Sequence, residues 1–103
     1  MRIYIYVDDV RTSIPWNRLK DIDVVRAKSY QNAIEYLKDT KEKYDEIYID
    51  LDHDLGEDKN GYDIAKWIVE NNFPLAGFHI HSANPVGVYN IRQLLIHYGY
   101  KEV

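Results

Sequence analysis

Short runs rich in β-branched and aromatic residues alternate with amphipathic stretches, and this alternation constrains the fold more than any other feature. Four runs have strand character: residues 2–7, 21–28, 46–51 and 77–82. Three stretches have helical character: residues 29–43, 62–72 and 88–99. Strands that alternate with helices favour a parallel sheet covered by helices. We therefore expect one α/β domain over residues 1–103, since a chain of 103 residues supplies a single core.

Two segments depart from a regular alternation. Residues 8–20 join the first two strands without a convincing amphipathic helix, and Pro15 stops any helix that begins there. The first helix of the usual pattern is therefore predicted to be lost or reduced to a turn. Residues 100–103 could add a short final strand.

Charge and composition exclude several function classes. The net charge of −4 argues against a broad surface for duplex nucleic acid, although a small phosphorylated ligand or an RNA end stays compatible with it. The chain has no cysteine, which excludes disulfides, thiol catalysis and cysteine-bound zinc and fits a reducing cytoplasm. No apolar run approaches membrane-spanning length, so we expect a cytoplasmic protein without a membrane partner. The oligomeric state is left open.

Charged and polar residues follow three of the predicted strands: Asp8, Asp9 and Arg11; Asp52, His53 and Asp54; His81, Ser82 and Asn84. In an open parallel sheet, ligands bind beyond the carboxyl ends of the strands. Each group alone has a plainer interpretation, as an Asx turn, a solvated loop or a core histidine. Their joint occurrence at one predicted edge favours a functional site.

The residue types indicate the chemistry. Clustered carboxylates repel one another, and a divalent cation removes that repulsion. Oxygen ligands from Asp8, Asp9 and either Asp52 or Asp54 suit Mg²⁺ or Mn²⁺, which also bridge to phosphate oxygens.

The remaining groups suit an anionic ligand and proton transfer. Arg11 offers a planar donor fork for phosphate, and Ser82 and Asn84 can donate to phosphoryl oxygens. His53 and His81 titrate near neutrality and suit general acid or base roles, without an indication of which does which.

Several motifs together resemble the cyclic-phosphate-processing receiver-like family, a derivative of the response-regulator receiver fold. The motifs are VDDVR, LDHDLG, GYDIAKW and HSANPVG, the last followed by Asn90. The resemblance implies a receiver-like (flavodoxin-like), doubly wound, mainly parallel sheet in three layers. Its strand order would be 2-1-3-4-5, with the last strand short or missing.

The resemblance also implies a site of acids and histidines that acts on cyclic phosphates, such as RNA ends or cyclic nucleotides. The catalytic set it implies is His53, His81, Asp52 and Asp54. The phosphate-binding set is Arg11, Ser82, Asn84 and Asn90, and the metal ligands are Asp8, Asp9 and Asp52.

The chain departs from the family's motif at Asp50, where the residue is usually small or polar. By strand spacing Asp50 could occupy the phospho-acceptor position of an ordinary receiver. By the LDHDLG motif that position is Asp52, which we prefer.

Three functions compete. The leading hypothesis is a metal-assisted phosphoesterase that opens a cyclic phosphate. The second is a phospho-accepting receiver, which leaves both site histidines unexplained and requires a lysine for which only Lys101 is available. The third is a protein that binds a cyclic nucleotide without turnover.

Overall fold

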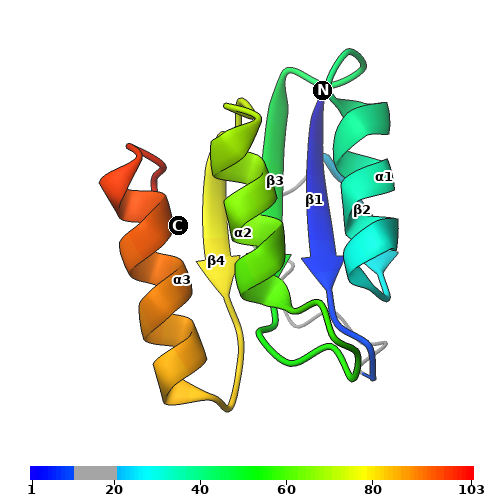
Figure 1. Cartoon of the computed structure of the whole chain (residues 1–103). Coiled ribbons are helices and arrows are strands. Elements are labelled where there is room, and N and C mark those ends of the chain that lie inside the picture. Colours follow the sequence, from blue (N-terminus) through cyan, green and yellow to red (C-terminus); the bar gives the residue numbers. More distant parts are fainter. Residues whose placement is uncertain (11–20) are drawn as a thin grey trace.

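The computed structural model describes residues 1–10 and 21–103, and the elements alternate there as predicted. The strands are β1 (Arg2–Val7), β2 (Ile22–Ala27), β3 (Glu46–Leu51) and β4 (Gly77–Ile80). The helices are α1 (Tyr30–Thr40), α2 (Gly61–Glu70) and α3 (Pro85–His97). The strands pair in parallel in the order β2-β1-β3-β4 (Figure 1). The predicted doubly wound receiver-like sheet is confirmed.

An isolated bridge near the C-terminus lies beside β4. Phe78 and Glu102 form a parallel bridge. The Phe78 N–H donates to the Lys101 carbonyl at 2.9 Å, and the Val103 N–H donates to the Phe78 carbonyl at 2.8 Å. Where a short or missing last strand was predicted, the chain forms only this single parallel bridge beside β4, and the sheet itself has four strands. The predicted reduction of the first helix concerns residues 11–20 and lies outside the described residues.

The two faces of the sheet differ in character. All three described helices lie on one face (Figure 1), where Ile5, Ile49 and Phe78 are fully buried in the apolar core. Because successive side chains of a strand point to opposite faces, Tyr6 and Asp50 face the other side. Both are buried as well. The third layer of the predicted fold is thus not among the described elements.

The third helix differs from its prediction at both ends. The helix was predicted over residues 88–99, but α3 begins at Pro85, with Asn84 as its N-cap. Proline suits the first position of a helix, because the N–H that it lacks has no partner there anyway. At the other end, Tyr98 belongs to the predicted range, but the helix ends before it and its side chain is 59% exposed. The helix stops at His97, and Gly99 turns the chain with a φ of 89°.

Asn60 closes the long polar loop that precedes α2. Its Oδ1 accepts from the Tyr62 and Asp63 N–H groups, and the Asp63 carboxylate accepts from the Asn60 N–H at 2.9 Å. This reciprocal capping box satisfies donors that would otherwise lack partners.

We expect Asn60→Ala to lower the free energy of unfolding by about 1 kcal/mol, because the helix loses its cap. Urea denaturation measures the change. Glu70→Ala, in the last turn of α2, is the matched control, because the Glu70 side chain is exposed and is not among the cap contacts of the helix. Equal losses in the two variants would contradict the assignment.

Candidate functional site

The sheet register brings three strand ends together. Val7 pairs with Leu51, and Leu51 pairs with Ile80, so the residues that follow them, Asp8, Asp52 and His81, emerge side by side. Two backbone hydrogen bonds extend this register past the strands, from the Asp52 N–H to the Val7 carbonyl (3.2 Å) and from the His81 N–H to the Leu51 carbonyl (2.9 Å).

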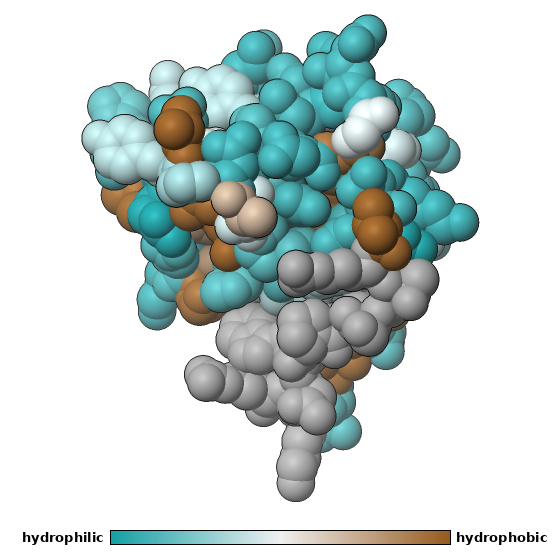
Figure 2. All heavy atoms as spheres, turned by 90° about the horizontal axis from the view of Figure 1, so that it is seen from below, coloured by the Kyte–Doolittle hydropathy of each residue, from teal (hydrophilic) through white to brown (hydrophobic). Residues whose placement is uncertain are grey.

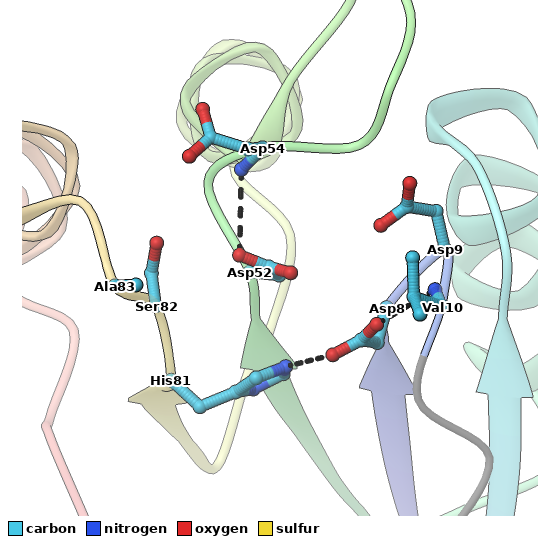
Figure 3. A pocket seen from close by; sticks show the side chains of 8 residues that line it. All are labelled: Asp8, Asp9, Val10, Asp52, Asp54, His81, Ser82 and Ala83. Atoms are coloured by element: carbon cyan, nitrogen blue, oxygen red, sulfur yellow. Dashed lines mark hydrogen bonds and ion pairs between the residues drawn. The ribbon is translucent and has the colours of Figure 1, made fainter.

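These side chains surround a pocket of about 210 Å³ at the carboxyl edge of the sheet (Figure 3). Its lining residues are Asp8, Asp9, Val10, Asp52, Asp54, His81, Ser82 and Ala83. Figure 2 views the molecule from this edge, and its described surface is largely hydrophilic. Four of the described lining side chains are carboxylates, and none of the described ones is lysine or arginine, which favours a cation over a bare anion.

Asp8 is the most deeply buried of the lining acids, at 2% exposure. Its Oδ1 accepts from the Val10 N–H at 2.9 Å. Its Oδ2 lies 3.0 Å from Nε2 of His81. Both oxygens are therefore oriented by the protein before any ligand arrives.

His81 lies between two carboxylates and against an aromatic ring. Its Nδ1 is 2.5 Å from Oδ1 of Asp50, and its ring stacks on Tyr6 with centroids 4.4 Å apart and an interplanar angle of 10°. Burial by itself lowers the pKa of His81, but the hydrogen bonds to Asp50 and Asp8 and the charges of Asp50 and Asp52 outweigh it and raise the pKa above 6.5. A protonated imidazole donates from both nitrogens, one to each carboxylate.

Asp52 and Asp54 are two residues apart, and their pKa values are shifted in opposite directions. Burial, with the nearby charge of Asp8, raises the pKa of Asp52 above its ordinary value of 3.8. The hydrogen bond from His53 lowers the pKa of Asp54, which is exposed. Figure 3 shows the Asp54 N–H directed at Asp52, while the Asp54 carboxylate points away.

His53 and Asn84 form a separate contact at the rim of the pocket. Nδ1 of His53 is 2.9 Å from Oδ1 of Asp54 and 3.3 Å from Nδ2 of Asn84. The imidazole packs on Gly87, where an added Cβ would come within 2.4 Å of the ring. Asn84 also accepts from the Gly87 N–H at 2.9 Å, so both ends of its side chain contact the protein.

The other predicted phosphate ligands have different positions. Ser82 lines the pocket, and its Oγ accepts from the Asn84 N–H at 3.2 Å. Asn90 instead lines a separate hollow with Tyr62 and His97, and the structure does not bring it to the acids. Arg11 lies outside the described residues.

The sequence reasoning assigned no role to Tyr4, Tyr6 or Asp50 as contacts of the site. The Tyr4 hydroxyl donates to Oδ2 of Asp50, which is 1% exposed. The period-two alternation of β1 and β3 already put these three residues on one sheet face. The register also separates the two acids of β3, because Asp52 reaches the pocket while Asp50 lies behind His81. Asp52 is thus the acid at the strand end.

Asp8, Asp52 and His81 are grouped closely enough to be compatible with a site for a metal ion. One ligand atom from each of Asp8, Asp52 and His81 lies within 4.8 Å of the others. The electrostatics also fit, because a cation would relieve the repulsion between Asp8 and Asp52 that contributes to the raised pKa of Asp52. Asp9 lines the same pocket and adds a fourth possible donor.

A parallel sheet in receiver order, with acids and a histidine at its carboxyl edge, defines a receiver-like α/β domain. The family model described as "Cyclic-phosphate processing Receiver domain" matches residues 3–97, and the chain belongs to that family. No curated protein and no solved structure matches the chain. In the part of the chain that the structure describes, no helix is long and apolar enough to cross a membrane.

The raised pKa of Asp52 predicts a gain in stability on its removal. An acid with a raised pKa in the folded state contributes its full stability below the ordinary pKa of 3.8 and loses it as pH rises through the raised value. We therefore expect metal-free Asp52→Asn to melt at a higher temperature than the wild type at neutral pH. At about pH 3 the gain should disappear, because Asp52 is then protonated in both states.

Asp54→Asn is the matched control with the opposite sign. Its lowered pKa means that ionised Asp54 stabilises the fold, so its removal should not raise the melting temperature at neutral pH. Scanning calorimetry of the three proteins at both pH values checks the pair. A gain in both variants would contradict the local origin of the effect.

Proposed function

We propose that this domain is a metal-assisted phosphoesterase that opens a cyclic phosphate, either at an RNA 2′,3′-cyclic end or in a cyclic nucleotide. The observation that carries the proposal is the convergence of Asp8, Asp52 and His81 on one pocket, with ligand atoms within 4.8 Å. The family to which the chain belongs supports the substrate class.

The pocket's charge is the reason for a metal in this proposal. Its described lining contains four carboxylates, which would repel a phosphate. Bound Mg²⁺ or Mn²⁺ would neutralise that charge and polarise a water molecule. Asp8, Asp9 and Asp52 would hold the ion, and Ser82 would donate to a phosphoryl oxygen. The volume of about 210 Å³ suits a phosphate group and its ion, with the nucleoside outside.

The reaction adds water across one phosphorus–oxygen bond. The water oxygen bonds to phosphorus, one bond from phosphorus to a ring oxygen breaks, and that oxygen leaves with the bonding electrons. One proton passes from the water to a base, and one passes from an acid to the leaving oxygen. His81 is the proton carrier inside the pocket. His53, with its neighbour Asp54, is the second carrier in this proposal and acts from the rim.

A phospho-accepting receiver is less well supported. Its lysine would have to reach a phosphoryl group at the carboxyl edge of the sheet. Because Phe78 pairs with Glu102, Lys101 is level with Gly77. Four residues of parallel strand, about 13 Å, separate that level from His81.

Metal binding tests the acids. We expect Mn²⁺ to bind the wild type weakly, because such sites complete their shell with water and substrate, and we expect Asp52→Asn to weaken binding further. His81→Ala should change Mg²⁺ affinity little, since imidazole is a poor ligand for that ion. Calorimetric titration gives the affinities, with Asp58→Asn in the exposed loop as control. Equal affinities in wild type and Asp52→Asn would remove Asp52 from the metal site.

Turnover tests the histidines. A panel of cyclic phosphates, incubated with and without Mg²⁺, is followed by phosphorus NMR. We expect His81→Ala and His53→Ala each to lower kcat by roughly 10²-fold or more, the usual worth of a general acid or base. The surface variant His97→Ala should behave as the wild type.

Two other outcomes would favour one of the alternative functions. Absence of turnover on the whole panel, with ligand affinity retained, would leave a binding protein and overturn the phosphoesterase. Acetyl phosphate that adds a phosphoryl group, detected by intact mass and abolished in Asp52→Asn, would support the receiver instead.

A further inference from the structure

We propose that Asp50 is a positioning residue that fixes the imidazole of His81 with Nδ1 turned inward and Nε2 turned to the pocket. The catalytic consequence of this role rests on the proposed function, whereas the ring orientation itself does not.

The burial of Asp50 requires an explanation. Asp50 lies inside a central strand and is 1% exposed. An ionised carboxylate in such a place is costly unless it is hydrogen-bonded or paired. An apolar residue would avoid the desolvation of a carboxylate but would leave the Tyr4 hydroxyl and Nδ1 of His81 without this partner.

Those contacts use both carboxylate oxygens. Oδ2 accepts from the Tyr4 hydroxyl, and Oδ1 lies 2.5 Å from Nδ1 of His81. The pairing of Tyr6, Asp50 and His79 across β1, β3 and β4 explains the geometry. Tyr4 is two residues before Tyr6, and His81 is two residues after His79, so the three side chains form a diagonal across one sheet face.

The contacts with Tyr6 and Asp50 favour one orientation of the His81 ring. Stacking on Tyr6, at 4.4 Å and 10°, fixes the plane of the imidazole. Within that plane, a rotation by half a turn would exchange the two edges of the ring. Asp50 opposes this exchange because it holds Nδ1 at 2.5 Å. Nε2 is then directed at Oδ2 of Asp8, 3.0 Å away at the wall of the pocket.

This arrangement gives the two ring nitrogens of His81 different roles. In this proposal the proton of this contact is on Nδ1, with Oδ1 of Asp50 as the acceptor. Nε2 is the nitrogen available to the pocket. Tyr4 acts indirectly, because its hydroxyl donates to the Asp50 carboxylate, which in turn contacts the imidazole of His81. The outer hydrogen-bond partners of metal-binding histidines are worth about 10- to 100-fold in activity or metal affinity, and we expect a similar effect here.

The test combines the NMR spectrum of the His81 ring nitrogens with phosphorus-NMR kinetics on the full chain. In the wild type we expect a slowly exchanging Nδ1 proton and a ring pattern with Nδ1 protonated. Asp50→Asn keeps the shape but presents an amide, so the pattern should change and kcat should fall about 10- to 100-fold, with KM nearly constant. Tyr4→Phe should give the same changes on a smaller scale.

Tyr44→Phe is the matched control, because it removes another tyrosine-to-aspartate hydrogen bond, 2.7 Å long, to Asp23 at the surface. It should leave both the ring spectrum and kcat unchanged. If Asp50→Asn does not fold, Tyr4→Phe alone decides.

Unchanged ring signals in a folded Asp50→Asn, or in Tyr4→Phe where only that variant folds, would overturn the proposal. If the wild type turns over no cyclic phosphate, the proposed function fails, while the ring spectra still decide the role of Asp50.

Discussion

The parallel register of β1, β3 and β4 is the constraint on which the site depends. It places Asp8, Asp52 and His81 at the same height beyond three adjacent strands. Two carboxylates at that spacing oppose each other's ionisation, and burial adds to the cost, as the raised pKa of Asp52 indicates. The protein moderates this repulsion with His81, whose Nε2 lies 3.0 Å from Asp8. A divalent cation would moderate it further.

The sheet serves two purposes on its two faces. The face toward the helices is apolar and supplies the core, with side chains such as Ile5 and Ile49. The opposite face carries the diagonal of Tyr4, Asp50 and His81, which contributes hydrogen bonds in place of apolar contacts. A buried polar network is costly when any member lacks a partner, and rigid when all are satisfied. Rigidity behind a pocket is useful, because a proton-transfer group must be held at a defined angle.

The receiver fold alone does not define the reaction, because one fold supports many activities. The distinctive feature of this chain is what surrounds the acids. His81 lines the pocket, whereas Lys101 is four residues short of the carboxyl edge. His53 belongs to a rim contact with Asp54 and Asn84, and Asn90 faces another hollow. The described side chains that line the pocket thus include four acids, one histidine and Ser82 around a small hollow.

The sequence by itself determined the order of strands and helices, since alternation and periodicity are local properties of the chain. It also predicted the edge at which Asp8, Asp52 and His81 gather, because polar residues follow the strands directly. It could not decide that ANPVG begins a helix, that Asn90 faces away from the acids, or that Asp50 supports His81. Those outcomes depend on the rotation of α3 and on contacts across three strands. Only the tertiary structure sets these, because each residue's partners there are distant in sequence.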